Sequence, residues 1–436
     1  MIRRCLLSSV LLLAGFIAGC EQPAADQKES SPSSAPPSTV SSPSANSVEM
    51  AANPILDRGL LTQEQIEDGW ISLFDGETLF GWEPNDDQVD WHVEDGMITA
   101  SEGPIGLLLT TVPYADFEFV CEYRLAEGGN SGVFIRTIPD PQDVMRDCYE
   151  INMADTHPQG FVTGSIVGRA PASTQPVGNS WQTLRILSRG REIQVELGGE
   201  VTVVHTDDTD GFRSSGRIGL QKNEGKIEFR RVVLKPLEMT TLFGGDSLDG
   251  WREVPGSKSE FEIDSQELHV VNGPGFLETE QTFADFLLQM QVRTGAENLN
   301  SGVFFRAQPG TEEAPSNGYE MQIHNGFQDG DRSSPMDSGS GAIFRRVPAR
   351  RVVANDEEWM TMTLVAAGPR MATWVDGYQV VAWEDEREPD ENPRRGKRLE
   401  AGHVSLQGHD PTTDVRFRQI LISTLPEPEQ STADAP

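Results

Sequence analysis

The chain is poor in cysteine and in basic residues. Its 436 residues include 4 Cys, and 35 Lys and Arg face 68 Asp and Glu, which gives a net charge of −33. This deficit of positive charge excludes a typical nucleic-acid binder, because phosphates require a compensating basic surface. The sequence also contains no Cys/His spacing typical of a metal site and no Gly-x-Ser-x-Gly nucleophile elbow. We therefore predict no cofactor, although a divalent metal is left open.

The N-terminus carries a short apolar run. Two arginines precede residues 6–18, and the run ends in Ile-Ala-Gly before Cys20. This pattern is typical of a secretory signal peptide, and small residues before a cysteine resemble the bacterial lipoprotein box. We expect a signal peptide over residues 1–19 and lipidation of Cys20 in the bacterial cell envelope. An outer-membrane anchor is favoured because Glu21, and not Asp, follows. An ordinary secretory signal with a chance cysteine is the alternative.

Two segments lack any hydrophobic periodicity. Residues 20–54 are rich in Ser, Pro and Ala, and residues 426–436 are rich in Pro and acidic residues. Such segments bury too little apolar surface to offset the entropy of ordering them. We expect a disordered tether that links the anchor to the folded part, and a disordered tail.

Cys121 and Cys148 are expected to be packing residues. Cys121 falls on an expected strand over residues 117–124, and Cys148 begins another strand, after one over residues 131–136. If these three strands form a meander, the two cysteines lie roughly 10 Å apart. That separation is too large for a disulfide.

The chain repeats one order of motifs, which indicates an internal duplication. The shift between copies grows from 169 residues at Phe74 and Phe243 to 188 at Phe229 and Phe417, so the second copy contains small insertions. We predict two tandem domains, at 55–238 and 239–425. The repeated motifs are Leu-Phe-Asp-Gly at 73 and Leu-Phe-Gly-Gly at 242, Gly-Trp at 81 and 250, Asn-Ser-Gly-Val-Phe-x-Arg at 130 and 300, and Tyr-Glu at 149 and 319.

Each copy has the pattern of many short strands. Gly-Gly at 198–199 and Asp-Gly at 376–377 separate alternating segments, as in two-residue β-hairpins. Thr62 with Gln65 three residues later predicts the start of a helix. Short strands joined by short turns indicate an all-β fold made of two antiparallel sandwiches.

The Asn-Ser-Gly strand and the Tyr-Glu strand after it form the candidate site. A period of two aligns an arginine on the first strand with a carboxylate and an amide on the second. These groups offer donors and acceptors to a polyhydroxylated ligand, although a buried Arg–Glu pair gives the same pattern. The two copies supply Arg136, Glu150 and Asn152, and Arg306, Glu320 and Gln322.

Taken together, these motifs resemble the 3-keto-disaccharide hydrolase family. The similarity covers nearly all of residues 60–425, and the combined pattern is specific whereas its single pieces are weak. It implies a concanavalin A-like jelly-roll fold related to laminarinases. It also implies a carbohydrate partner, a disaccharide or glycoside already oxidised to a ketone at sugar carbon 3.

The resemblance implies a particular chemistry. A ketone at C3 acidifies the proton on C2, so that a base can remove it and the aglycone at C1 can leave before water adds. On this reading Glu320 or Glu150 is the base, and Arg306 or Arg136 is an electrostatic stabiliser. His409 is an acid or a substrate contact.

Both copies depart from the family pattern Glu-x-Gln-x-x-Asp. The first copy keeps Glu150 and Asp155 but has Asn152, and the second keeps Gln322 but has Asn325 in place of the acid. The alternative function is therefore a non-catalytic carbohydrate-binding lipoprotein of the same fold. The predicted substrate-binding residues are Gln322, Asn152, Asp155, Asn300 and Asn130.

Overall fold

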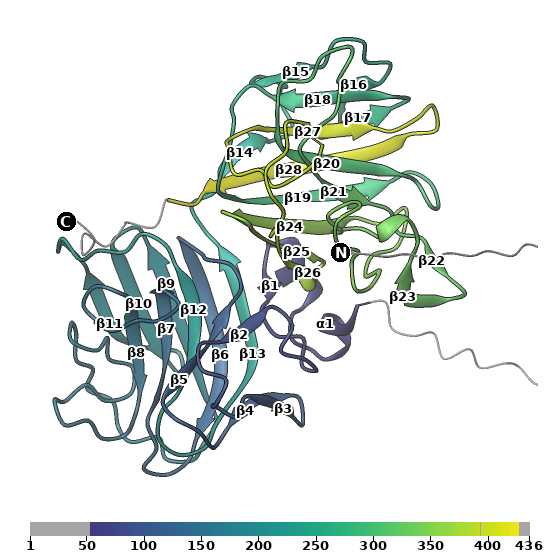
Figure 1. Ribbon diagram of the computed structural model, residues 1–436. Helices are drawn as coiled ribbons and strands as arrows, with labels where there is room; N and C mark the ends of the chain where they lie inside the picture. The colour runs from purple at the N-terminus through teal and green to yellow at the C-terminus, as the bar shows by residue number, and fades with distance from the viewer. Residues whose placement is uncertain (1–52, 393, 427–436) are drawn as a thin grey trace, which may run out of the picture. The chain divides into compact units, whose positions relative to one another are not determined.

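The computed structural model describes residues 53–392 and 394–426 (Figure 1). The expected signal peptide, Cys20 and nearly all of the tether lie outside these residues, as does the tail after residue 426. Within the described ranges, no helix is long and apolar enough to cross a membrane.

The first half of the folded chain forms two antiparallel sheets. Its strands are β1 (Ile71–Ser72), β2 (Trp82–Pro84), β3 (His92–Glu94), β4 (Met97–Ala100), β5 (Gly106–Thr110), β6 (Phe117–Leu125), β7 (Ser131–Thr137), β8 (Tyr149–Met153), β9 (Gln182–Arg189), β10 (Glu192–Leu197), β11 (Glu200–Thr206), β12 (Arg217–Lys222) and β13 (Ile227–Pro236). The larger sheet has the order β11-β10-β9-β6-β13-β4-β3, with β1 beside β13, and the smaller has the order β2-β5-β12-β7-β8.

The second half repeats this arrangement. Its strands are β14 (Thr240–Phe243), β15 (Trp251–Glu253), β16 (Glu260–Asp264), β17 (Glu267–Val271), β18 (Gly275–Thr279), β19 (Phe286–Thr294), β20 (Ser301–Ala307), β21 (Tyr319–Ile323), β22 (Phe327–Gln328), β23 (Asp331–Pro335), β24 (Met360–Ala367), β25 (Arg370–Val375), β26 (Tyr378–Glu384), β27 (His403–Gly408) and β28 (Asp414–Thr424). A 3₁₀ turn, η1 (Met336–Ser338), follows β23.

The two halves have the same topology. The larger sheet of the second half has the order β16-β17-β28-β19-β24-β25-β26, with β14 beside β28, and the smaller has the order β15-β18-β27-β20-β21. Each strand therefore takes the position of its counterpart, with β20 for β7 and β21 for β8. The β22–β23 pair is an addition of the second half. The predicted all-β fold of two tandem sandwiches is confirmed.

Local sequence patterns explain several of these elements. Burial alternates strictly along β6, because one face of its sheet packs on the core. The Gly-Gly hairpin joins β10 to β11, with both glycines at positive φ, and Asp376-Gly377 joins β25 to β26 in the same way. The capping box at Thr62 starts α2 (Gln63–Glu67) as predicted.

The predicted meander around the cysteines is wrong. β6 lies in the larger sheet between β9 and β13, whereas β7 and β8 are neighbours in the smaller sheet. The Glu-Gly-Gly turn after β6 therefore carries the chain from one sheet to the other. Cys121 and Cys148 are both free and buried.

The segment before β1 packs on the second sandwich. Ile55 of α1 (Pro54–Asp57) and Ile66 of α2 belong to the same apolar cluster as the core of the second half. The side chain of Gln289 also donates to the carbonyl of Gly69 at 2.9 Å. Residues that precede the first sandwich thus contribute buried surface to the second.

Candidate active site

The candidate site lies on the outer face of the smaller sheet in the second sandwich. Glu320 on β21 is opposite Phe304 on β20, and Phe304 is opposite Ser405 on β27. Residues opposite one another in a ladder share a face of the sheet. Alternate residues point the other way, and Val303 and Met321 are fully buried in the core between the sheets.

The glycine of the Asn-Ser-Gly motif makes room for the glutamate of the next strand. A Cβ atom on Gly302 would lie 2.7 Å from Glu320 Oε1, so a larger residue there would force the carboxylate to move. In the first sandwich, a Cβ on Gly132 would lie 3.4 Å from Glu150 Oε1. The hydroxyl of Ser301 donates to the Gln407 carbonyl at 2.7 Å and so ties β20 to β27. The Asn-Ser-Gly motif therefore forms the part of the sheet surface against which the Glu320 carboxylate packs.

Burial gives both glutamates a weakly acidic carboxyl group. Glu320 is 8% exposed, and loss of hydration raises its pKa to about 7. The charge of Asp337 also raises this pKa, whereas Arg394 and Arg345 oppose the increase. Burial likewise raises the pKa of Glu150 to about 7, against a hydrogen bond from Gln221. A carboxylate of this kind can act as a general base near neutral pH.

A second carboxylate stands beside the second site. Asp337, in η1, accepts a hydrogen bond from Gln322 Nε2 at 3.0 Å and another from Asn300. Asp337 is exposed and takes a left-handed backbone conformation with φ 43°. The Gly341 amide donates to the Gln322 carbonyl, and the Gly164 amide makes the equivalent bond to the Asn152 carbonyl. Counting back equally from these two glycines aligns Asp337 with Gly160 of the first sandwich. The second sandwich alone has an acid at this position.

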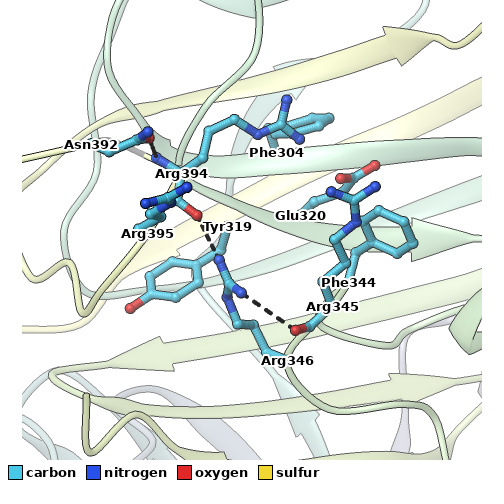
Figure 2. A pocket seen from close by; sticks show the side chains of 10 residues that line it. Phe304, Tyr319, Glu320, Phe344, Arg345, Arg346, Asn392, Arg394 and Arg395 are labelled. Atoms are coloured by element: carbon cyan, nitrogen blue, oxygen red, sulfur yellow. Dashed lines mark hydrogen bonds between the residues drawn. The ribbon is translucent and has the colours of Figure 1, made fainter. Parts of the chain in front are cut away.

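A pocket of about 330 Å³ opens next to Glu320 (Figure 2). Its walls combine two phenylalanines with a group of arginine side chains that come from two loops. The residues that line it are Phe304, Gly318, Tyr319, Glu320, Phe344, Arg345, Arg346, Asn392, Arg394 and Arg395. A buried carboxylate thus faces a polar cavity large enough for a small ligand.

Comparison with known proteins finds one family match in each sandwich. A family profile described as the 3-keto-alpha-glucoside-1,2-lyase-like domain matches residues 69–235 and again residues 238–423. The chain belongs to this family. Each sandwich is therefore one 3-keto-alpha-glucoside-1,2-lyase-like domain.

Individual relatives are more distant. A "3-keto-disaccharide hydrolase" of Bacteroides thetaiotaomicron is 26% identical over 153 residues, which cover 28% of this chain and 52% of the relative. The chain thus spans about half the length of this curated relative. A candidate glycosyl hydrolase structure from Parabacteroides distasonis is 21% identical with a TM-score of 0.36, covering 41% of this chain and 98% of that one. The carbohydrate-binding module CBM66 from Bacillus subtilis is 16% identical with a TM-score of 0.28, covering 36% and 95%.

In both lyase-like domains the motif arginine lies away from the glutamate, so the predicted shared face is wrong. A β-bulge in β20 gives Arg306 a φ of 48° and turns its side chain towards the interior. The guanidinium donates to the carbonyls of Ala284, Gly368 and Arg398 and to Asp285, at 2.7–2.8 Å. The Arg306 guanidinium therefore stabilises the fold by linking these loops.

The arginine of the first lyase-like domain is held in the same way. Arg136 also has a positive φ, at 49°, and is fully buried. Its guanidinium donates to the Ala115, Gly190 and Arg213 carbonyls and to Asp116, at 2.7–3.0 Å. Neither Arg136 nor Arg306 hydrogen-bonds the glutamate, Glu150 or Glu320, that it was predicted to assist.

The amide and acid after Glu150 are used by the scaffold of the first domain. Asn152 donates to the Phe161 carbonyl. Asp155 accepts from the amides of Val177 and Gly178 at 2.8 and 2.9 Å. These bonds hold a long loop against the sheet.

Asn325, which replaces the family acid in the second domain, also has a structural role. It donates to the carbonyl of Asn355 and to Asp356, and it accepts from the Ser340 hydroxyl at 2.7 Å. Asn325 therefore links the neighbouring loops through its own hydrogen bonds, although it carries no charge.

Of the predicted site residues, Glu320 is the one that lines the pocket. His409 follows β27, bonds Asp410 at 3.0 Å and is not among the residues that line the pocket. Asn130 in the first domain pairs through its backbone with Glu224, and its side-chain oxygen is buried without a hydrogen-bond partner. Of the predicted residues, Gln322 and Asn300 bind the carboxylate of Asp337, whose charge acts on Glu320. Among the described residues, no cluster of three or more potential metal ligands occurs.

Sequence reasoning missed Asp337 and the pocket arginines. Arg394 and Arg395 lie in the longer loop between β26 and β27, whereas Asp337 and Arg345 lie between the added β22–β23 pair and β24. The growing shift between copies indicated these insertions, and the pairs Arg345-Arg346 and Arg394-Arg395 stand out in an acidic chain. Nothing in the linear order, however, placed them beside Glu320.

Proposed function

We propose that the second domain cleaves 3-keto-glycosides, with Glu320 as the general base. The observation that carries this proposal is a buried carboxyl group with a pKa of about 7 that lines a polar pocket. The name of the Bacteroides relative and the family description support the substrate class.

The proposed reaction begins at the carbon next to the ketone. Glu320 removes the proton on C2, and the electron pair forms an enolate with the C3 carbonyl. The enolate then expels the aglycone from C1, which breaks the C1–O bond and leaves a C1–C2 double bond. Addition of water across this bond completes a net hydrolysis, and the proton on Glu320 returns to C2.

Asp337 is proposed to hold the water molecule that gives a proton to the leaving oxygen, and the hydroxide left behind adds to C1. Gln322 and Asn300 donate hydrogen bonds to the Asp337 carboxylate and so hold it in place. Its negative charge also raises the pKa of Glu320. His409 remains a predicted substrate contact outside the pocket.

The first domain is proposed to be non-catalytic. Glu150 has a Gln221 hydrogen bond at 3.4 Å and a glycine where the second domain has Asp337. Its neighbours Asn152 and Asp155 are engaged by loops. This domain supplies scaffold or carbohydrate binding.

The test compares three variants on one 3-keto-glucoside. Glu320→Gln is expected to reduce turnover by at least about a hundredfold, since general-base catalysis contributes roughly 10²–10⁴-fold. Glu150→Gln, the matched control in the other domain, is expected to leave the rate unchanged. A fully active double variant would eliminate both glutamates as bases. Binding of the ketone without any product in the unmodified chain would favour the carbohydrate-binding alternative.

The proposal includes export and lipid anchoring at the cell envelope, favouring the outer membrane. It rests on the apolar run before Cys20. Cys20→Ala is expected to move the protein from the membrane fraction to the soluble fraction of exported proteins. Unchanged membrane association of that variant would overturn the anchor.

A further inference from the structure

The pocket beside Glu320 concentrates positive charge in an acidic chain. Four arginines line it, although the chain carries a net charge of −33. Within the described residues, none of these four side chains lies within 4.0 Å of an acidic group, whereas the neighbouring Arg387 pairs with Asp385. The four arginines, called the arginine cluster below, are Arg345, Arg346, Arg394 and Arg395.

Arg345 is held in a conformation that suits glycine. Its φ is 60°, in the left-handed region, and the first domain has Gly168 at the equivalent place with φ 73°. The equivalence follows from the preceding residues, because Phe344 and Val167 make the same backbone bond to Glu320 and Glu150. A long side chain at such a position is strained, and strain of this kind is typical of functional sites.

Arg346 has lost the acidic partner of its counterpart. In the first domain Arg169 lies 3.7 Å from Asp207 and is buried. In the second domain Arg387 takes the equivalent acid, Asp385, through two hydrogen bonds of 2.7 Å. Arg346 instead donates to the Arg394 carbonyl at 2.5 Å, and Asp385 acts on its charge only from beyond ion-pair distance. Figure 2 shows this link across the pocket.

The loop of Arg394 completes the cluster. Tyr149 accepts a backbone bond from Arg213, and Tyr319 accepts the same bond from Arg398, so the two loops end at equivalent points. The second loop is longer and carries Arg394, whose side chain donates to the Ser316 hydroxyl at 2.8 Å. Two independent insertions or replacements have therefore added positive charge at one place.

We infer that the arginine cluster binds an acidic group, a carboxylate or a sulfate, carried by the glycoside that Glu320 acts on. This inference rests on the proposed function for the glycoside part of the ligand. Planar guanidinium groups recognise oxyanions through paired N–H donors, and none of these four forms an ion pair within 4.0 Å with an acid of the described chain. Neutral glycosides leave these charges without a partner, so the cluster selects for acidic substrates.

The experiment measures binding and turnover separately, with four phenyl glycosides as probes. Phenyl glucoside is neutral, phenyl glucuronide and 4-carboxyphenyl glucoside carry a carboxylate on the sugar or the aglycone, and phenyl glucoside 6-sulfate carries a sulfate. Calorimetry on the full chain gives the affinity of the unoxidised forms, and their 3-keto forms give kcat/KM. At least one acidic probe is expected to bind about tenfold or more tightly than the neutral one, and the preference should weaken with salt.

Variants assign the preference to the cluster. Arg345→Gly restores the residue of the first domain at a position that favours glycine, so it is expected to fold normally and to lose most of the preference. Arg394→Gln should add to this loss. Arg146→Gln, which removes an equal charge from a side chain that is 80% exposed in the first domain, is the matched control and should change nothing.

The outcomes separate this inference from the proposed function. Equal affinity for acidic and neutral probes, or an acid preference that survives Arg345→Gly with Arg394→Gln, would overturn the inference. An arginine-dependent preference without turnover of any 3-keto form would support the anion site and contradict the proposed reaction. Turnover of the neutral 3-keto form with no acid preference would support the proposed reaction and contradict the anion site.

Discussion

At the scale of single residues, the repeated motifs combine scaffold and site in adjacent positions. In Asn-Ser-Gly-Val-Phe-x-Arg, the serine ties two strands, the glycine makes room for a carboxylate and the arginine anchors loops in the interior. The same duplication copied all three roles. A motif residue that recurs in both domains is therefore as often structural as functional.

The buried arginine gives the first prediction. Arg306→Gln is expected to lower the free energy of unfolding by about 3–5 kcal/mol, because it leaves Asp285 and several carbonyls without their donor. Urea denaturation measures this change. Arg146→Gln should change stability by less than about 0.5 kcal/mol. Equal effects of the two variants would show that the buried network contributes nothing.

The second prediction concerns the pH dependence of the proposed reaction. Glu320 must be ionised to accept a proton, and burial raises its pKa to about 7. The value of kcat/KM is therefore expected to rise with pH and to level off above about 7, with a tenfold fall per pH unit well below it. A rate profile from pH 4 to 9 measures this limb. A limb near the ordinary carboxylate value of 4.5 would contradict the role of burial.

At the scale of secondary structure elements, turns and insertions decide how the two domains differ. The smaller sheets have the same strand order, yet the second domain adds β22–β23 before η1 and a longer loop after β26. These additions bring Asp337 and Arg394 to the sheet face that already carries Glu320. Variation in loops over a constant scaffold is a common way to change chemistry.

The β25–β26 hairpin gives the third prediction. Asp376 in its turn is half-buried, accepts from the Thr361 amide at 2.8 Å, and has its pKa raised by loss of hydration from 3.8 to about 7. Because the folded-state pKa is the higher one, its contribution to stability is present below pH 3.8 and is lost as pH rises through about 7.

Asp376→Asn is the matched change for this prediction. Asparagine tolerates the left-handed backbone at φ 46° and can keep the bond to Thr361 without a charge. The variant is expected to gain stability relative to the unmodified chain as pH rises from 4 to 8. Urea denaturation at both pH values measures the difference. A stability difference that does not change with pH would contradict a raised pKa.

At the scale of the whole folded chain, residues far apart in sequence share buried contacts. Trp374 of the second domain is 1% exposed, lies in the apolar cluster of the first, and donates from its indole nitrogen to the Ser72 carbonyl at 3.0 Å. Ile55 and Ile66, which precede the first domain, pack in the cluster of the second. The two domains are therefore interleaved through these segments.

This interleaving gives the fourth prediction. Unfolding of one domain exposes apolar surface of the other, so both are expected to unfold in a single transition. Urea titrations followed by tryptophan fluorescence and by far-UV circular dichroism should coincide. Two resolved transitions would show that the shared contacts contribute little to the stability of either domain.

The sequence by itself determined the duplication, the all-β fold and the hairpin turns, and it singled out Glu320 and Gln322 as candidate site residues. These follow from local signals: strand periodicity, Asp-Gly and Gly-Gly turns, and motifs that recur in order. The tertiary structure alone decided which arginines line the pocket beside Glu320. A single bulge, not visible in a period of two, turned Arg306 into the interior. Loops that are 17 to 74 residues away in sequence brought Asp337, Arg345 and Arg394 to Glu320, because the fold, and not the chain order, sets which side chains meet.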